Sequence, residues 1–152
     1  MQSVLHIASL GQVIQLSVAP VFLLAGVGTT LNVLASRIGR IIDRARMMEE
    51  KLPQAAPDDA RELHQRLKTL SRRATLINRA IGLCVLCGLL VSLVVAALFV
   101  SSALDIDLAL PIAIAFVVAL LSLALALLFF LREVFIATES QTFGGERRRR
   151  RG

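Results

Sequence analysis

Cys84 and Cys87, two cysteines separated by two residues, have the clearest potential for chemistry in this sequence. Such a pair performs redox chemistry when one thiol is a reactive thiolate, a state that basic neighbours or solvent favour. Here the pair lies in an apolar run shortly after Arg79, so we predict two packing residues and keep thiol redox or metal chemistry as the alternative. The sequence has no other metal-site spacing, phosphate-binding loop or nucleophile elbow. We therefore expect a non-enzymatic protein without a cofactor.

A second group consists of charged residues at helical spacing: Arg40, Asp43, Arg44 and Arg46. Asp43 lies three residues from both Arg40 and Arg46, which allows ion pairs on the surface of a helix. Exposed pairs of this kind contribute little to stability. We therefore expect the group to matter at a contact between protomers, where it would set the register.

Five consecutive arginines form the most basic stretch of the chain. Near an anionic leaflet, each arginine contributes roughly 1 kcal/mol of binding free energy. We predict a solvated marker of the cytoplasmic side, with contact to anionic lipid as the alternative and no specific nucleic-acid partner. The run comprises Arg147, Arg148, Arg149, Arg150 and Arg151.

Small and polar residues share one face of the apolar stretch that begins near residue 18. Small side chains allow two membrane helices to approach closely, and an asparagine can donate a hydrogen bond across such a contact. We predict a helix-packing or oligomer face, with a ligand or ion contact at Asn32 as the alternative. The face consists of Ala25, Gly26, Gly28, Thr29 and Asn32.

The charged residues are segregated, and the segregation defines the elements that carry these groups. The chain is 56% hydrophobic with a mean hydropathy of +0.73. Three stretches contain no Asp, Glu, Lys or Arg, and each is long enough for a membrane-spanning helix of about 20 residues. The sequence therefore predicts an all-α membrane protein with three transmembrane helices, at 13–35, 81–103 and 111–131.

The distribution of positive charge predicts how the spans are oriented. Residues 36–80 contain eleven Lys and Arg against six Asp and Glu, whereas residues 1–12 and the loop 104–110 contain no Lys or Arg. Positive residues remain on the cytoplasmic side of a membrane. We expect 1–12 and 104–110 to be periplasmic, 36–80 to be cytoplasmic, and 132–152 to be a basic, disordered cytoplasmic tail.

Residues 36–80 read as two amphipathic helices joined by a proline-bounded turn at 53–57. Their apolar stripes predict an antiparallel hairpin that extends the first two spans into the cytoplasm. The alternative is a basic helix that lies flat on the bilayer. The predicted stripes are Ile38, Ile41, Ile42, Ala45, Met48 and Leu52 on the first helix, opposite Arg37, Arg40, Arg44 and Lys51, and Leu63, Leu67, Leu70, Ala74, Ile77 and Ile81 on the second.

The segment from Ala19 to about Met48 carries the pattern APVFLL-G-…-LNVL-…-R-…-RI-DRAR. This pattern resembles a bacterial family known as domain of unknown function 2721, and the three-span layout extends the resemblance to roughly residues 10–135. The resemblance implies a small bacterial inner-membrane protein. It implies no activity, substrate or catalytic residue, and the terminal arginines lie outside it.

The sequence leaves two functions open beside the weaker redox role. The first is a self-associating scaffold or partner-binding protein. The second is a homo-oligomeric channel or pore lined by the first span, in which Gln12, Gln15, Thr29 and Asn32 would face water.

Overall fold

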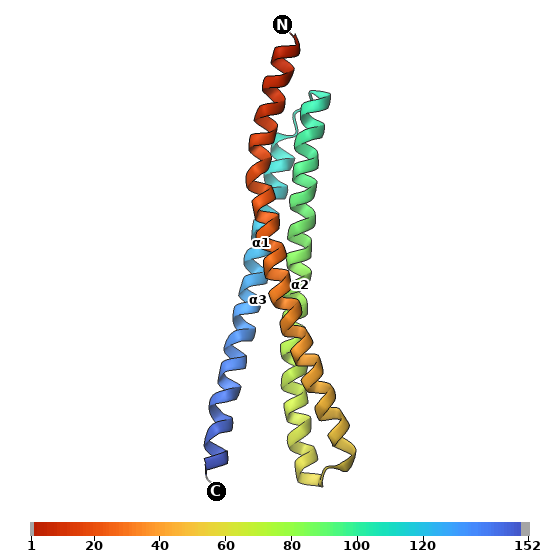
Figure 1. The fold of residues 1–152 in the computed structure, drawn as a ribbon, viewed down its shortest axis with the longest axis vertical. Coiled ribbons are helices and arrows are strands. Elements are labelled where there is room, and N and C mark those ends of the chain that lie inside the picture. The colour runs from red at the N-terminus through yellow and green to blue at the C-terminus, as the bar shows by residue number, and fades with distance from the viewer. Residues whose placement is uncertain (1, 150–152) are drawn as a thin grey trace. The chain divides into compact units, whose positions relative to one another are not determined.

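The structure is a computed structural model that describes the backbone of residues 2–149 and the side chains of residues 11, 14–57 and 59–137. Three long helices and one short 3₁₀ turn make up this part of the chain (Figure 1). The predicted all-α fold is thus confirmed. In chain order the elements are α1 (Gln2–Lys51), η1 (Leu52–Gln54), α2 (Pro57–Leu104) and α3 (Ala109–Arg149).

Each long helix contains a stretch long and apolar enough to cross a membrane, within Ile14–Gln54, Asp59–Leu104 and Ala109–Ala137. Large apolar side chains are exposed along all three stretches, for example Phe22 at 74% and Leu121 at 59%. Soluble monomers rarely expose large contiguous apolar patches. The exposed apolar surface and the length of the helices together indicate a membrane protein with three spans.

The chain divides into two compact units, which we describe separately. Unit 1 comprises Met1–Leu31 and Gly82–Leu125, and its buried side chains come from all three helices. α1 and α2 pack closely at Gly88, where an added Cβ would lie 3.8 Å from Val27 Cγ1 and 3.9 Å from Leu24 Cδ2. Among the described side chains of unit 1, the buried residues are Ser17, Pro20, Val27, Cys84, Cys87, Val91, Val94, Ala119 and Ser122.

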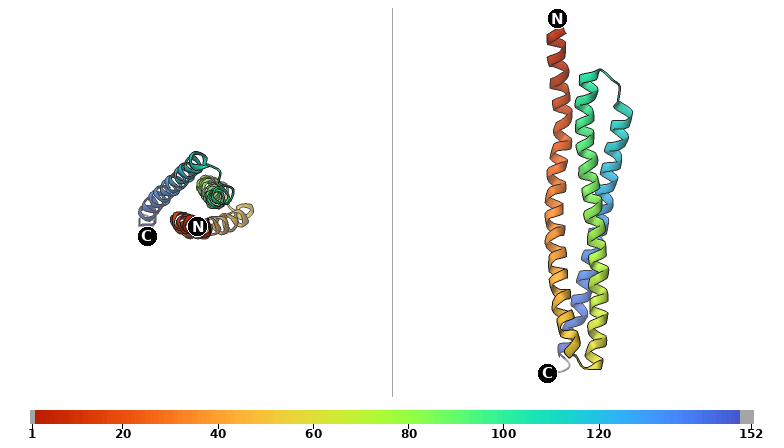
Figure 2. Two further views of the ribbon diagram at one scale, coloured as in Figure 1. Left: turned by 90° about the horizontal axis from the view of Figure 1, so that it is seen from above. Right: turned by 90° about the vertical axis from the view of Figure 1, so that its right-hand side faces the viewer.

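The connection between α2 and α3 in unit 1 is a capped turn (Figure 2). Asp105 has a φ of 53°, and the Ile106 amide donates to the carbonyl of Ser101 at 3.2 Å. A hydrogen bond between residues five positions apart is typical of a helix C-terminus when the residue just after the helix, here Asp105, has a left-handed backbone conformation. Asp107 Oδ1 then accepts a hydrogen bond from the Ala109 amide at 3.0 Å, and Pro111 occupies the first turn of α3 as predicted.

Unit 2 comprises Asn32–Ile81 and Ala126–Gly152. In it, α1 and α2 are joined through η1 near the predicted turn at 53–57, and the chain reverses direction there (Figure 2). α2 begins at Pro57, which lacks an N–H that the first turn of a helix would leave unpaired. The Ala55 amide donates to the carbonyl of Leu52 at 3.4 Å, and the Ala60 amide donates to that of Ala56 at 2.8 Å.

Burial along α1 and α2 confirms most of the predicted apolar stripes in unit 2. Leu70 and Ile77 are buried, and the other predicted members on α2 are half-buried. On α1, Ile41 is buried, but the prediction for Ile42 is wrong because its side chain is 45% exposed. The buried residues of α1 in unit 2 are Leu34 and Ile41, seven residues apart, as in helices that pack along a seam.

The third helix continues beyond the predicted end of its span. The sequence predicted a disordered tail over 132–152, but α3 extends to Arg149. Within 132–137, Glu133 is buried against the other two helices of unit 2, whereas Arg132 and Phe135 are exposed. The side chains of Arg147, Arg148 and Arg149, and all of Arg150 and Arg151, lie outside the described residues. The predicted contact of these arginines with anionic lipid therefore stays a prediction.

Candidate functional site

Glu133 on α3 is the one carboxylate whose side chain is fully buried among the described residues. Ala119 and Ala126 are also buried and precede it at intervals of seven residues, so all three lie on the same face of α3. The small side chains at 119 and 126 allow this face to pack closely. In unit 2, the carboxylate of Glu133 is buried against side chains of α1 and α2.

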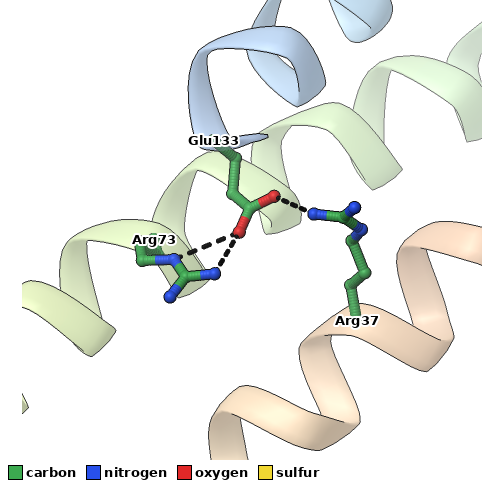
Figure 3. A network of polar contacts seen from close by, with 3 residues as sticks. All are labelled: Arg37, Arg73 and Glu133. Carbon is green, nitrogen blue, oxygen red and sulfur yellow. Dashed lines mark hydrogen bonds and ion pairs between the residues drawn. The ribbon is translucent and has the colours of Figure 1, made fainter. Parts of the chain in front are cut away.

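Two arginines from the other helices bind this carboxylate (Figure 3). Arg37 on α1 donates from Nη1 to Glu133 Oε2 at 2.9 Å. Arg73 on α2 donates to Glu133 Oε1 from Nε at 3.1 Å and from Nη2 at 2.7 Å. Both carboxylate oxygens are thus engaged, and one side chain connects the three helices of unit 2.

The environment of the two arginines differs. The Arg73 side chain is 15% exposed, whereas that of Arg37 is 31% exposed. The guanidinium carbon of Arg37 also lies 5.0 Å from the ring centroid of Phe130, one turn before Glu133 on α3. A cation over an aromatic ring at this distance is stabilised by the ring quadrupole. Arg37 therefore contacts α3 at two successive turns.

A cavity of about 340 Å³ adjoins this network in unit 2. Four arginines and a single carboxylate line it, together with apolar side chains. Guanidinium groups are the usual partners of carboxylate and phosphate in proteins because their donors match the geometry of those anions. The lining residues are Arg37, Arg40, Ile41, Arg44, Leu70, Arg73, Glu133, Val134 and Ala137.

A comparison with protein-family models matches residues 17–143 to a model described as a protein of unknown function (DUF2721). The chain belongs to the DUF2721 family. The matched residues cover most of the chain, include the three members of the Glu133 network, and exclude the terminal arginine run. A search of curated proteins and a search of solved structures each found no match.

The predicted ion-pair cluster of this DUF2721 chain concerns a contact between protomers, and that role stays a prediction. Among the described side chains, no hydrogen bond or ion pair joins Arg40, Asp43, Arg44 or Arg46 to one another. All four are exposed, and exposed pairs on a helix gain too little energy to hold long side chains in place. Arg40 and Arg44 instead line the cavity beside Glu133.

The structure leaves the predicted packing face of α1 uncovered. In unit 1, Ala25, Gly26, Gly28 and Thr29 are all exposed, and an added Cβ at either glycine would meet no atom within 4 Å. In unit 2, Asn32 is exposed as well. The face therefore does not serve packing within the described part of this chain, and its role as an oligomer face stays a prediction.

Cys84 and Cys87 lie on the buried face of α2 in unit 1 and are both 0% exposed and free. Cys84 is seven residues before Val91, and Cys87 is seven residues before Val94, so the cysteines belong to two lines of core residues. Their burial supports the prediction of packing residues in this DUF2721 chain.

Sequence reasoning missed Glu133, Arg37 and Arg73 as a group. Arg37 was assigned to a charged stripe opposite the seam, and Glu133 to a disordered tail. The signal that could have identified them is the seven-residue spacing of buried positions. Glu133 is seven residues after the buried Ala126, and Arg73 is seven residues before the buried Ala80. An ionisable residue on a buried line must find a partner, because an unpaired buried charge is costly.

Proposed function

We propose that this DUF2721 protein is a non-enzymatic integral membrane protein that associates with copies of itself, as a scaffold or a partner-binding protein. The observation that carries this proposal is the uncovered small-residue face of α1 in unit 1. Gly28 lies on it beside Ala25 and Thr29, with open space beyond its Cα atom. A second helix could approach closely there, as in small-xxx-small contacts between membrane helices.

The hydroxyl groups on this part of α1 already have partners. Thr29 Oγ1 donates to the carbonyl of Ala25 at 3.0 Å, and Thr30 Oγ1 donates to that of Gly26 at 2.9 Å. The face therefore presents little unsatisfied polarity to a partner helix or to lipid. Asn32, one turn further along α1, supplies an exposed amide that can donate across a contact between protomers.

We further propose a bacterial inner membrane, with residues 1–12 and 104–110 on the periplasmic side and 36–80 and 132–152 on the cytoplasmic side. The support is the distribution of Lys and Arg, which are absent from the first two segments and abundant in the other two. This orientation places the Glu133 network and its cavity at the cytoplasmic boundary of the membrane.

The mass of the assembly in nanodiscs tests self-association. We expect native protein to give a multiple of the 16.5 kDa protomer mass. Gly28→Leu fills the open space on the α1 face and should reduce the assembly toward single protomers. Gly82→Leu is the matched control, because Gly82 on α2 is also exposed and has open space. A single-protomer mass for the native protein, or equal loss in both variants, would contradict the proposal.

A homo-oligomeric channel lined by α1 is the second candidate function. Gln15 and Asn32 on α1 are exposed, which favours a ring of protomers in which polar side chains face water. Gln12, which the sequence assigned to the same role, has no described side chain. Planar-bilayer recordings separate the two functions: the channel requires conductance that Asn32→Leu alters, whereas silent bilayers with assembled protein favour the scaffold.

A further inference from the structure

The cavity of unit 2 carries positive charge that the Glu133 network does not neutralise. Four of its lining residues are arginines, and one is a carboxylate, which gives a net charge of +3. Glu133 binds Arg37 and Arg73. Among the described side chains, Arg40 and Arg44 have no hydrogen bond or ion pair.

Arg40 and Arg44 lie one turn apart on α1, so both line the same side of the cavity. Apolar side chains from all three helices, Ile41, Leu70 and Val134, complete its lining. Its volume of about 340 Å³ lies within the range of small-molecule sites, roughly 300–1,000 Å³. A polar headgroup with its first carbons fits both this volume and this mixed lining.

The position of the cavity along the chain indicates that a phosphate group is the anion it would bind. Arg37 is the first charged residue after the uncharged stretch from Met1 to Ser36. Glu133 is the second charged residue after the uncharged stretch from Leu108 to Leu131. On the proposed spans, the cavity therefore lies at the level of the phosphate groups of the bilayer. Basic pockets between membrane helices at this level bind the headgroups of anionic lipids.

We propose that the cavity between Arg40, Arg44 and the Glu133 network binds a phosphate group, supplied either by an anionic lipid headgroup or by free phosphate. Arg40 and Arg44 donate to the phosphate oxygens, and Glu133 holds Arg37 and Arg73 in position beside them. This site is separate from the small-residue face of α1 and is distinct from the terminal arginines.

Two binding measurements distinguish the sources of the phosphate group. In the first, native mass spectrometry counts phosphatidylglycerol bound to the full chain, with phosphatidylcholine as the neutral reference. In the second, isothermal titration calorimetry adds inorganic phosphate to the protein in phosphatidylcholine nanodiscs. The cavity variant is Arg40→Gln with Arg44→Gln. The control variant is Arg46→Gln with Arg72→Gln, which removes the same charge from exposed positions that do not line the cavity.

We expect the cavity variant to weaken phosphatidylglycerol binding by about 30-fold, since each arginine near an anionic headgroup contributes roughly a factor of five. The control variant should weaken it by less than about threefold. Phosphate binding in the second measurement with the same dependence on Arg40 and Arg44 would identify free phosphate as the ligand. If inorganic phosphate does not bind but phosphatidylglycerol binding depends on Arg40 and Arg44, the ligand is the lipid headgroup.

Equal losses in the two variants, an unaffected cavity variant, or no binding in either measurement would overturn the proposal. Arg40 and Arg44 have no partner among the described side chains, so the variant should retain its helices, which circular dichroism checks. If the double variant loses its helices, the single variants Arg40→Gln and Arg44→Gln serve instead, each with a loss of about fivefold. Self-association is measured by mass, so failure here leaves that proposal standing.

Discussion

The carboxylate of Glu133 joins α3 to the other two helices of unit 2. It is fully buried and accepts hydrogen bonds from two arginines on two other helices. A buried ion pair contributes little net stability when it is intact, but removal of one partner leaves uncompensated charge. Loss of Glu133 therefore leaves both arginines without their carboxylate partner.

The first prediction concerns removal of this carboxylate. Glu133→Ala leaves Arg37 and Arg73 unpaired, and we expect it to lower the free energy of unfolding by about 3 kcal/mol. The value lies at the lower end of the usual range because both arginines reach solvent. Unfolding by SDS in mixed micelles, followed by circular dichroism, measures the change.

Glu62→Ala is the control for Glu133→Ala. Glu62 pairs with Arg66 at 2.7 Å, but both side chains are more than half exposed, so its loss should cost less than about 1 kcal/mol. Equal losses in the two variants would show that the Glu133 network is an ordinary surface ion pair.

A second prediction at the residue scale concerns Cys84 and Cys87. Both thiols are 0% exposed, so we expect a maleimide to label neither cysteine in the folded protein and both after unfolding in SDS. Thiol exchange and redox chemistry require access to the sulfur. Rapid labelling of the folded protein would contradict the packing role and would restore the redox alternative.

At the scale of elements, the hairpin of α1 and α2 in unit 2 depends on apolar contacts. Leu70 and Ile41 are each 6% exposed and line the same cavity from the two helices, whereas Ile42 is 45% exposed. This distribution favours helices packed on each other over a helix that lies flat on the bilayer. A flat helix would use its whole apolar stripe, including Ile42, against lipid.

The third prediction tests this packing. Leu70→Ala should lower the free energy of unfolding by about 2–4 kcal/mol, because it leaves a cavity in a packed contact. Ile42→Ala should change it by no more than about 0.5 kcal/mol, as exposed substitutions do. The same SDS titration in neutral micelles measures both. A larger effect of Ile42→Ala than of Leu70→Ala would instead support the helix that lies on the bilayer.

The elements themselves were predictable from the sequence because their signals are local. Charge-free stretches define the three apolar helices, and Pro53 and Pro57 define the turn between α1 and α2. The network was not predicted because its three members are far apart in the chain. The bonds from Glu133 to Arg73 and Arg37 connect residues separated by 60 and 96 positions. Their meeting depends on the relative register of three helices, which no single helix encodes.

The length of α3 also could not be predicted from the local sequence pattern. Arg132 and Glu133 read as the start of a polar tail, since a charged pair usually ends an apolar span. In the structure, arginines on α1 and α2 pair with Glu133, and α3 continues past it as a helix to Arg149. Tertiary contacts override the local signal at this position.

At the scale of the whole molecule, the place of each site depends on how the chain crosses the membrane. The exposed apolar side chains and the three long apolar helices indicate the spans. The proposed orientation depends on the arginines alone. It also determines the leaflet in which the arginine-lined cavity would meet phosphate groups.

The fourth prediction tests that orientation with paired topology reporters in bacterial cells. An alkaline phosphatase or fluorescent-protein reporter is fused after Gly152, and the same reporters are inserted at Asp105 in the α2–α3 turn. Three spans with cytoplasmic arginines predict fluorescence without phosphatase activity at Gly152 and phosphatase activity without fluorescence at Asp105. Phosphatase activity at Gly152, or the same compartment for both positions, would contradict the account.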